Sequence, residues 1–110
     1  NFERAKAHYS NLYWGASLEA LKYLAEKKGY KFVCTNSSGN NAYFIKSSKF
    51  SNIELKLEKD FHEGKFRESR NKNGEKNFLH GSQKIKEIYD CKVICVETNT
   101  EKKLKDFLNK

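Results

Sequence analysis

Apolar positions recur at helical spacing along the stretch that follows Ser17. This stripe consists of Leu18, Leu21, Leu24 and Ala25. Ser17 stands at the N-cap position, where a hydroxyl accepts from the free amides of a first helical turn. Gly29 follows two lysines and occupies the position just past the end of the stripe, where glycine commonly ends a helix. These local signals predict a helix that begins after Ser17 and ends before Gly29.

Two short runs rich in aromatic and β-branched residues come next, Tyr30–Thr35 and Ala42–Lys46. Such runs are typical of β-strands. Residues 36–41 between them read NSSGNN, and Gly39 and the asparagines tolerate a positive φ. The pattern therefore predicts an antiparallel β-hairpin directly after the helix.

Three other segments give less regular patterns. Residues 1–13 have apolar positions three and four apart, which favours a short amphipathic helix or an ordered lead-in. Residues 47–62 fit a strand or a helix, and their glutamates and lysines favour the helix. Residues 64–81 are polar and aperiodic, which indicates a long loop with a turn at 71–74.

The C-terminal third predicts a helix, a strand and a second helix. Residues 82–90 form the first helix, whose expected buried residues are Ile85, Ile88 and Tyr89. Residues 92–97 are apolar on both faces, which is typical of an internal strand. Thr100 is the expected N-cap of the last helix, whose inward residues are Leu104, Phe107 and Leu108. The fold class is thus α/β: a helix, an antiparallel β-hairpin and an α/β tail.

Length and composition limit what the chain can be. Its 110 residues suit a single domain over 1–110, and a hydrophobic content of 37% supports a modest core. The alternative is that the chain is a C-terminal fragment of a larger α/β domain. We consider it because the sequence contains no Met and opens on Asn1. No apolar run reaches the roughly 20 residues that span a membrane, and no segment resembles a signal peptide.

The cysteine count is odd, and each cysteine lies in an apolar, β-like run. The three are Cys34, Cys91 and Cys95. Free cysteine is among the most buried residue types, and a disulfide framework favours an even count. We therefore expect buried, reduced thiols and a cytoplasmic location.

The formal net charge is +8, and only three of the 22 basic residues are arginines. We favour a solvated basic face, with an anionic partner as the alternative. Arg67 and Arg70 lie three apart, and each offers a planar fork for carboxylate or phosphate that lysine lacks. They form either surface ion pairs with Glu63 or Glu68, or contacts to an anionic ligand.

Basic residues also alternate with aromatic ones, as at 30–32, 49–50 and 65–67. This pattern fits a stacking platform for single-stranded nucleic acid. In a strand, however, alternation places the aromatics and the lysines on opposite faces. We therefore favour a role for these aromatics in the core, and regard nucleic acid as a less favoured partner.

Several kinds of site are not predicted. The glycines are isolated, and a backbone cradle for phosphate needs them clustered at a helix N-terminus, so no nucleotide or methyl-donor site can be assigned. No metal site is expected from His8, His62 and His80, which are far apart in sequence. No serine lies in a G-x-S-x-G elbow, so no catalytic residue can be named.

The chain resembles the C-terminal part of class I S-adenosylmethionine-dependent methyltransferase-like proteins, most closely a bacterial group related to the FkbM type. The residues that carry this resemblance are Tyr13–Leu18, Ala20–Leu21, Lys28–Tyr30, Cys34–Ile45, Phe66–Arg70 and Phe78–Gly81. The resemblance implies the C-terminal portion of a Rossmann-like sheet, in which a helix leads into the antiparallel hairpin of the sixth and seventh strands.

In that family, the glycine-rich donor loop and the acidic residue for the donor's ribose belong to the N-terminal half. Neither occurs in this sequence. The resemblance therefore implies an acceptor-side region that works with a missing N-terminal half or another subunit, and S-adenosylmethionine as cofactor of the parent protein. Its predicted polar contacts to substrate are Asn36, Ser38, Asn41, Arg67 and Arg70. The alternative is a non-enzymatic basic module that binds an anionic partner such as nucleic acid.

Overall fold

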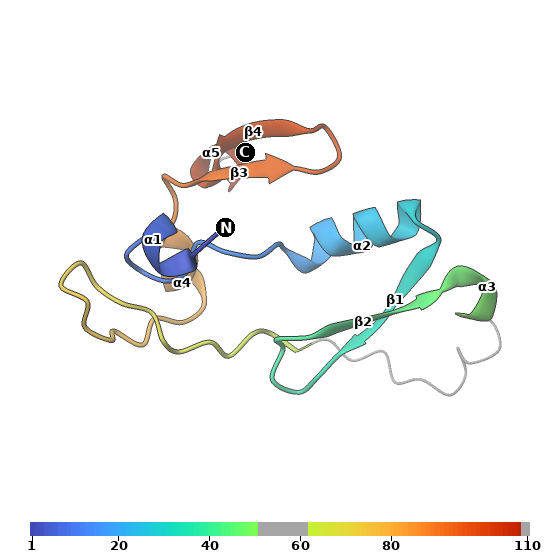
Figure 1. Ribbon diagram of the computed structural model, residues 1–110, viewed down its shortest axis with the longest axis horizontal. Helices are drawn as coiled ribbons and strands as arrows, with labels where there is room; N and C mark the ends of the chain where they lie inside the picture. The colour runs from blue at the N-terminus through green and yellow to red at the C-terminus, as the bar shows by residue number, and fades with distance from the viewer. Residues whose placement is uncertain (51–61, 109–110) are drawn as a thin grey trace. The chain divides into compact units, whose positions relative to one another are not determined.

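The computed structural model describes residues 1–50 and 62–108 of the chain. It is a mixed α/β structure with two separate, two-stranded antiparallel sheets (Figure 1). Its elements are α1 (Arg4–Ala7), α2 (Leu18–Lys27), β1 (Tyr30–Thr35), β2 (Ala42–Lys46), α3 (Ser47–Phe50), α4 (Ser82–Glu87), β3 (Lys92–Cys95), β4 (Thr100–Lys103) and α5 (Leu104–Leu108).

The chain divides into two compact units. The first unit comprises Asn1–Gly15 together with Phe66–Lys110, and the second unit comprises Ala16–Lys65. The first unit therefore holds α1, α4, α5 and the β3–β4 sheet, whereas the second holds α2, α3 and the β1–β2 sheet.

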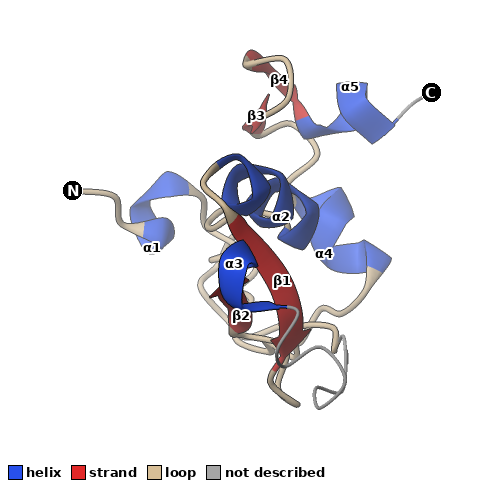
Figure 2. Cartoon of the chain, turned by 90° about the vertical axis from the view of Figure 1, so that its right-hand side faces the viewer, coloured by secondary structure: helices blue, strands red, loops and turns tan. Residues whose placement is uncertain are grey.

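In the second unit, α2 and the β1–β2 hairpin confirm the sequence prediction. Ser17 caps α2, since its Oγ accepts from the amide of Ala20 at 3.1 Å. Gly29 follows the helix with a φ of 82°, a conformation that glycine adopts without strain. The chain then enters β1, and α2 lies against this strand (Figure 2).

The β1–β2 hairpin carries a β-bulge in β1. Phe32 pairs with Phe44, and their rings meet edge to face with centroids 5.8 Å apart. Cys34 is the next residue of β1 to find a partner, so Val33 is the extra residue of the bulge. Val33 and Phe50, 6% and 7% exposed, are the buried hydrophobic side chains of this unit among the described residues.

Helix α3 continues directly from β2, and the amide of Ser47 donates to the carbonyl of Gly29 at 2.8 Å. The helix predicted over 47–62 is thus present over Ser47–Phe50. Residues 51–61 of that prediction lie outside the described residues, and its last residue, His62, is not helical.

The first unit has a small core in which polar side chains are the most deeply buried. Leu12 is 9% exposed, whereas Ser10 and Ser69 are completely buried. The amide of Arg70 donates to the carbonyl of Ser10 at 3.1 Å, which ties the lead-in to the long loop. Helix α1 is shorter than the predicted amphipathic pattern and buries no residue.

The long loop over 64–81 is present as predicted, and it contains the expected turn. The amide of Gly74 donates to the carbonyl of Asn71 at 3.0 Å, and Gly74 has a φ of 82°. An isolated bridge pairs Arg70 with Lys76 across this turn.

The C-terminal segment corrects two predictions. Thr100 does not cap a helix, because it begins strand β4, and the last helix starts only at Leu104. β3 pairs with β4 alone among the described residues, so it is not an internal strand, and Ile94 is 58% exposed. The reason is a hairpin turn at 96–99, in which Asn99 adopts a φ of 52°.

Burial predictions were wrong at several apolar positions of the C-terminal helices. Ile85 of α4 is 43% exposed and Leu108 of α5 is 50% exposed, although both were expected to face inward. The helices are short, with six and five residues, so neither presents a continuous face to a core. The three cysteines are free but only half-buried, and not fully buried as predicted.

Candidate functional site

The hairpin loop over 36–41 is organised by the side chain of Asn36. Its Oδ1 accepts from the backbone amides of Asn40 and Asn41, both at 3.1 Å. Its Nδ2 donates to Asn40 Oδ1 at 2.6 Å. Asn36 was predicted to contact a substrate, but these three bonds give its side chain a role inside the loop. Ser38 and Asn41, predicted for the same role, are exposed.

Residues 62–65 hold this loop from one side. The amide of His62 donates to Thr35 Oγ1 at 2.7 Å, and the amide of Lys65 donates to the carbonyl of Ser38 at 3.3 Å. A β-carbon on Gly39 would lie 2.4 Å from both the carbonyl carbon and the oxygen of Glu63. The backbone of the loop therefore approaches this segment at a distance that only glycine allows.

Arg67 and Arg70, the other two predicted contact residues, belong to the first unit, whereas the loop belongs to the second. Nη1 of Arg67 donates to the carbonyl of Phe66 at 3.3 Å, and Nη1 of Arg70 donates to that of Gly74 at 3.4 Å. Arg67 is exposed and Arg70 is half-buried. Each bond engages one guanidinium nitrogen, so both side chains keep further donors.

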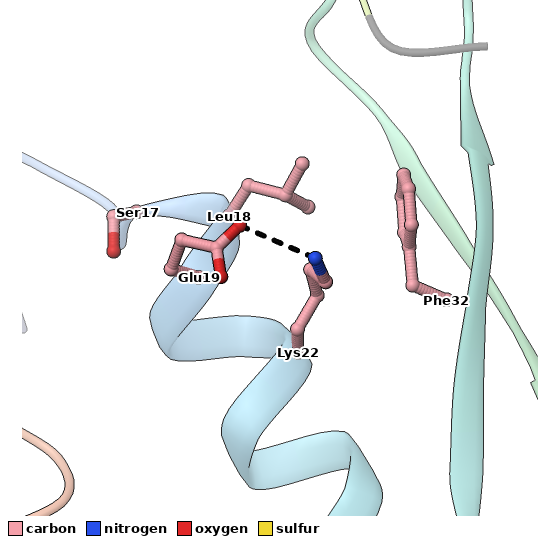
Figure 3. A pocket seen from close by; sticks show the side chains of 5 residues that line it. All are labelled: Ser17, Leu18, Glu19, Lys22 and Phe32. Carbon is pink, nitrogen blue, oxygen red and sulfur yellow. Dashed lines mark hydrogen bonds and ion pairs between the residues drawn. The ribbon is translucent and has the colours of Figure 1, made fainter. Parts of the chain in front are cut away.

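A shallow hollow of about 270 Å³ lies beside the first turn of α2, in the second unit. Leu18 and Lys22 point from α2 toward Phe32 on β1 (Figure 3). Lys22 forms an ion pair with Glu19, which also lies on α2. The ammonium of Lys22 lies 5.7 Å from the centre of the Phe32 ring. With one cation already paired to a carboxylate, the hollow offers no unbalanced charge for an ionic ligand.

An aromatic cluster in the first unit was not predicted from the sequence. Cζ of Arg4 lies 5.2 Å from the Trp14 ring centre and 5.0 Å from that of Phe66. The two rings meet edge to face, with centroids 6.0 Å apart and an interplanar angle of 72°. Phe66 was expected to serve the core, yet it is only half-buried, and Trp14 is 50% exposed. The signals that could have found this cluster are the single tryptophan and the scarcity of arginine.

Two lysines surround Asp90 at the C-terminal hairpin, and these contacts shift the pKa values of Asp90 and Lys105. Lys105 Nζ lies 2.7 Å from Asp90 Oδ1, and Lys103 Nζ lies 3.4 Å from the same oxygen. The hydrogen bonds from Lys105 and then Lys103 hold the pKa of the Asp90 carboxyl below its usual value. The same carboxylate raises the pKa of Lys105.

We expect the substitution Lys105→Gln to raise the pKa of Asp90 toward the value of a free aspartate. Because the folded state lowers this pKa, the contact stabilises the hairpin above the unfolded-state pKa, and the stabilisation is lost as the pH falls through the lowered value. An NMR titration of the Asp90 carboxyl carbon measures the shift. Lys102→Gln is the matched control, since its ammonium lies over the Phe107 ring at 5.7 Å. Equal pKa values in both variants would contradict the assignment.

The thiols differ in their electrostatic surroundings. Donation from the Thr98 hydroxyl and from the amides of Thr98 and Glu97 lowers the pKa of Cys95. Burial raises the pKa of Cys91. Within the described parts of the chain, no group of three His, Cys, Asp or Glu side chains is placed to hold a metal ion.

Comparison of the chain with protein-family models, with curated proteins and with solved structures finds no match. In residues 1–50 and 62–108, no helix combines the length and the apolar character needed to cross a membrane.

Proposed function

We propose that the chain is the C-terminal, acceptor-side region of a class I S-adenosylmethionine-dependent methyltransferase. One observation carries this proposal: α2 leads directly into the antiparallel β1–β2 hairpin, whose polar loop is held in a defined shape by residues 62–65. A helix followed by such a hairpin is the arrangement that the family resemblance implies for the end of the Rossmann-like sheet. The sequence segments Tyr13–Leu18 and Cys34–Ile45 support the same assignment.

In this proposal, Ser38 and Asn41 contact the methyl acceptor from the loop, and Asn36 keeps the loop in shape through its three bonds. Separately, Arg67 and Arg70 of the first unit are proposed as cationic donors to an anionic group of a ligand. The donor S-adenosylmethionine binds to a different part of the parent protein or to another subunit, because this sequence holds no glycine cluster for it. A cytoplasmic location fits the three free cysteines.

The test is calorimetric titration of S-adenosylmethionine into two proteins. The 110-residue chain is expected to give no binding heat, whereas the product of its whole open reading frame is expected to bind the donor. Ser38→Ala and Asn41→Ala in that product should leave donor binding unchanged, because the loop faces the acceptor. Donor binding by the 110-residue chain, or none by the whole product, would show the proposal to be wrong.

The second candidate is a non-enzymatic module that binds an anionic partner. It is supported by the excess of basic residues, which gives a net charge of +8, and by the exposed Arg67. Such a module would bind oligonucleotides with an affinity that falls steeply as the salt concentration rises. The absence of donor binding by the whole reading-frame product would favour it over the methyltransferase.

A further inference from the structure

We infer that the cluster of Arg4, Trp14, Phe66 and Arg67 in the first unit is a binding site for a nucleotide, with a base stacked on Trp14 and a phosphate held by the arginines. This inference goes beyond the methyltransferase proposal and does not depend on it. It starts from Trp14, which is 50% exposed although Arg4 and Phe66 both contact it. Tryptophan normally buries much of its large ring, so a half-exposed tryptophan in contact with a cation is a candidate recognition surface.

The aromatic part of the cluster suits a nucleobase. Phe66 meets Trp14 edge to face, which fixes the orientation of the indole and leaves part of its surface in solvent. Stacking on an aromatic side chain stabilises the binding of a base by roughly 1–3 kcal/mol, largely irrespective of which base it is. An exposed indole held by a second ring is thus a preformed stacking surface.

The cationic part of the cluster suits a phosphate. The guanidinium carbon of Arg4 lies within 5.2 Å of both ring centres. This cation–π contact uses none of the N–H groups of Arg4, so they can donate to a phosphate. The neighbouring Glu3 is paired with Lys6 at 2.8 Å, so its carboxylate is occupied. Arg67 follows Phe66 and is exposed, with one bond to a backbone carbonyl. Arg4 therefore brings a guanidinium to the aromatic pair, and Arg67, the residue after Phe66, carries a second one with donors to spare.

Lysine could not replace arginine in this arrangement. A guanidinium combines stacking on a ring with a planar fork for phosphate oxygens, whereas an ammonium is a compact, hydrated point charge. Nineteen of the 22 basic residues are lysines (22 minus three arginines), yet Arg4 lies over both rings and Arg67 directly follows Phe66. The use of arginine here in a lysine-rich chain is what a site for both base and phosphate requires.

The experiment uses the intrinsic fluorescence of Trp14, which is the only tryptophan of the chain. An eight-residue oligothymidylate is titrated into the 110-residue protein, beside an abasic strand with the same number of phosphates and beside thymidine monophosphate. We expect saturable quenching by the oligothymidylate and roughly tenfold weaker binding of the abasic strand. The mononucleotide separates the two sources of the ligand: binding as tight as that of the strand assigns a free nucleotide, and weaker binding assigns single-stranded nucleic acid.

Variants separate this site from general attraction to a basic protein. Arg4→Gln should weaken oligothymidylate binding roughly tenfold, whereas Lys86→Gln, at an exposed lysine of the same unit, should change it less than about twofold. Arg67→Gln is a second test that leaves the contacts between the rings intact. The salt dependence of oligothymidylate binding to this variant should correspond to about one phosphate contact fewer. Circular dichroism checks the fold of each variant. Three results would overturn the inference: linear quenching like that of free tryptophan, equal binding of the abasic strand, or equal losses in Arg4→Gln and Lys86→Gln.

Discussion

Replacing Gly39 with alanine is expected to lower the free energy of unfolding by about 3 kcal/mol. Gly39 has a φ of 68°, and a left-handed conformation costs an L-residue roughly 1–2 kcal/mol. The new methyl group would also lie 2.4 Å from the carbonyl of Glu63 and would force the backbone apart, which costs about 1–3 kcal/mol when no flexible side chain can yield. Urea unfolding followed by circular dichroism measures the loss.

The control for this experiment is Gly29→Ala in the same unit. Gly29 has a φ of 82°, but nothing lies within 4 Å of the site where its β-carbon would stand. This substitution should therefore cost only the conformational part, about 1 kcal/mol. If both variants lose the same stability, the close approach of the hairpin loop to residues 62–65 does not exist in solution. Hydrogen exchange at Asn36 and Asn41 then shows whether the loop itself has loosened.

Local signals were sufficient for the part of the fold that carries the proposed function. The N-cap at Ser17, the glycine at 29 and the polar run at 36–41 each act within a few residues, so the sequence predicted the bounds of both hairpin strands correctly. The bulge at Val33 was not predicted, because an extra residue in a strand depends on how the two strands pair. The loop's asparagines were predicted as site residues, whereas the bonds of the Asn36 side chain within the loop became visible only in the fold.

The C-terminal hairpin was missed because Thr100 is ambiguous. Threonine is favoured both at helix N-caps and in strands, and the sequence pattern gave the helix too much weight. The signal for a hairpin was Asn99, since asparagine tolerates the left-handed conformation that this turn needs. The hydroxyls of Thr98 and Thr100, on either side of Asn99, share a hydrogen bond of 2.6 Å.

The arginine–aromatic cluster could not be predicted, since it depends on contacts between residues that are far apart in sequence. Arg4 and Trp14 come from the lead-in, whereas Phe66 comes from the long loop. No period or spacing relates these segments. Their meeting is set by tertiary bonds such as that between the amide of Arg70 and the carbonyl of Ser10. This is why the sequence pattern assigned Phe66 to the core.

Replacing Ser69 with alanine is expected to destabilise the protein by about 2 kcal/mol. Ser69 is completely buried, and its Oγ donates to Asn77 Oδ1 at 2.6 Å and accepts from the amide of Leu79 at 3.0 Å. Its removal leaves a donor and an acceptor without their partner, and a buried polar group in that state costs about 1–3 kcal/mol. Urea unfolding measures the change, and Ser82→Ala, at an exposed serine, should stay within about 0.5 kcal/mol of the unaltered chain.

A double-mutant cycle assigns this loss to the named bond. Asn77→Ala alone also breaks the contact with Ser69, so the double variant should lose at least about 0.5 kcal/mol less than the sum of the single losses. Additive losses would mean that the two side chains do not interact. The bond matters for the proposed nucleotide site because Ser69 anchors the segment that carries Phe66 and Arg67. Ser69→Ala should therefore weaken oligothymidylate binding as well, although Ser69 is buried and cannot touch the ligand.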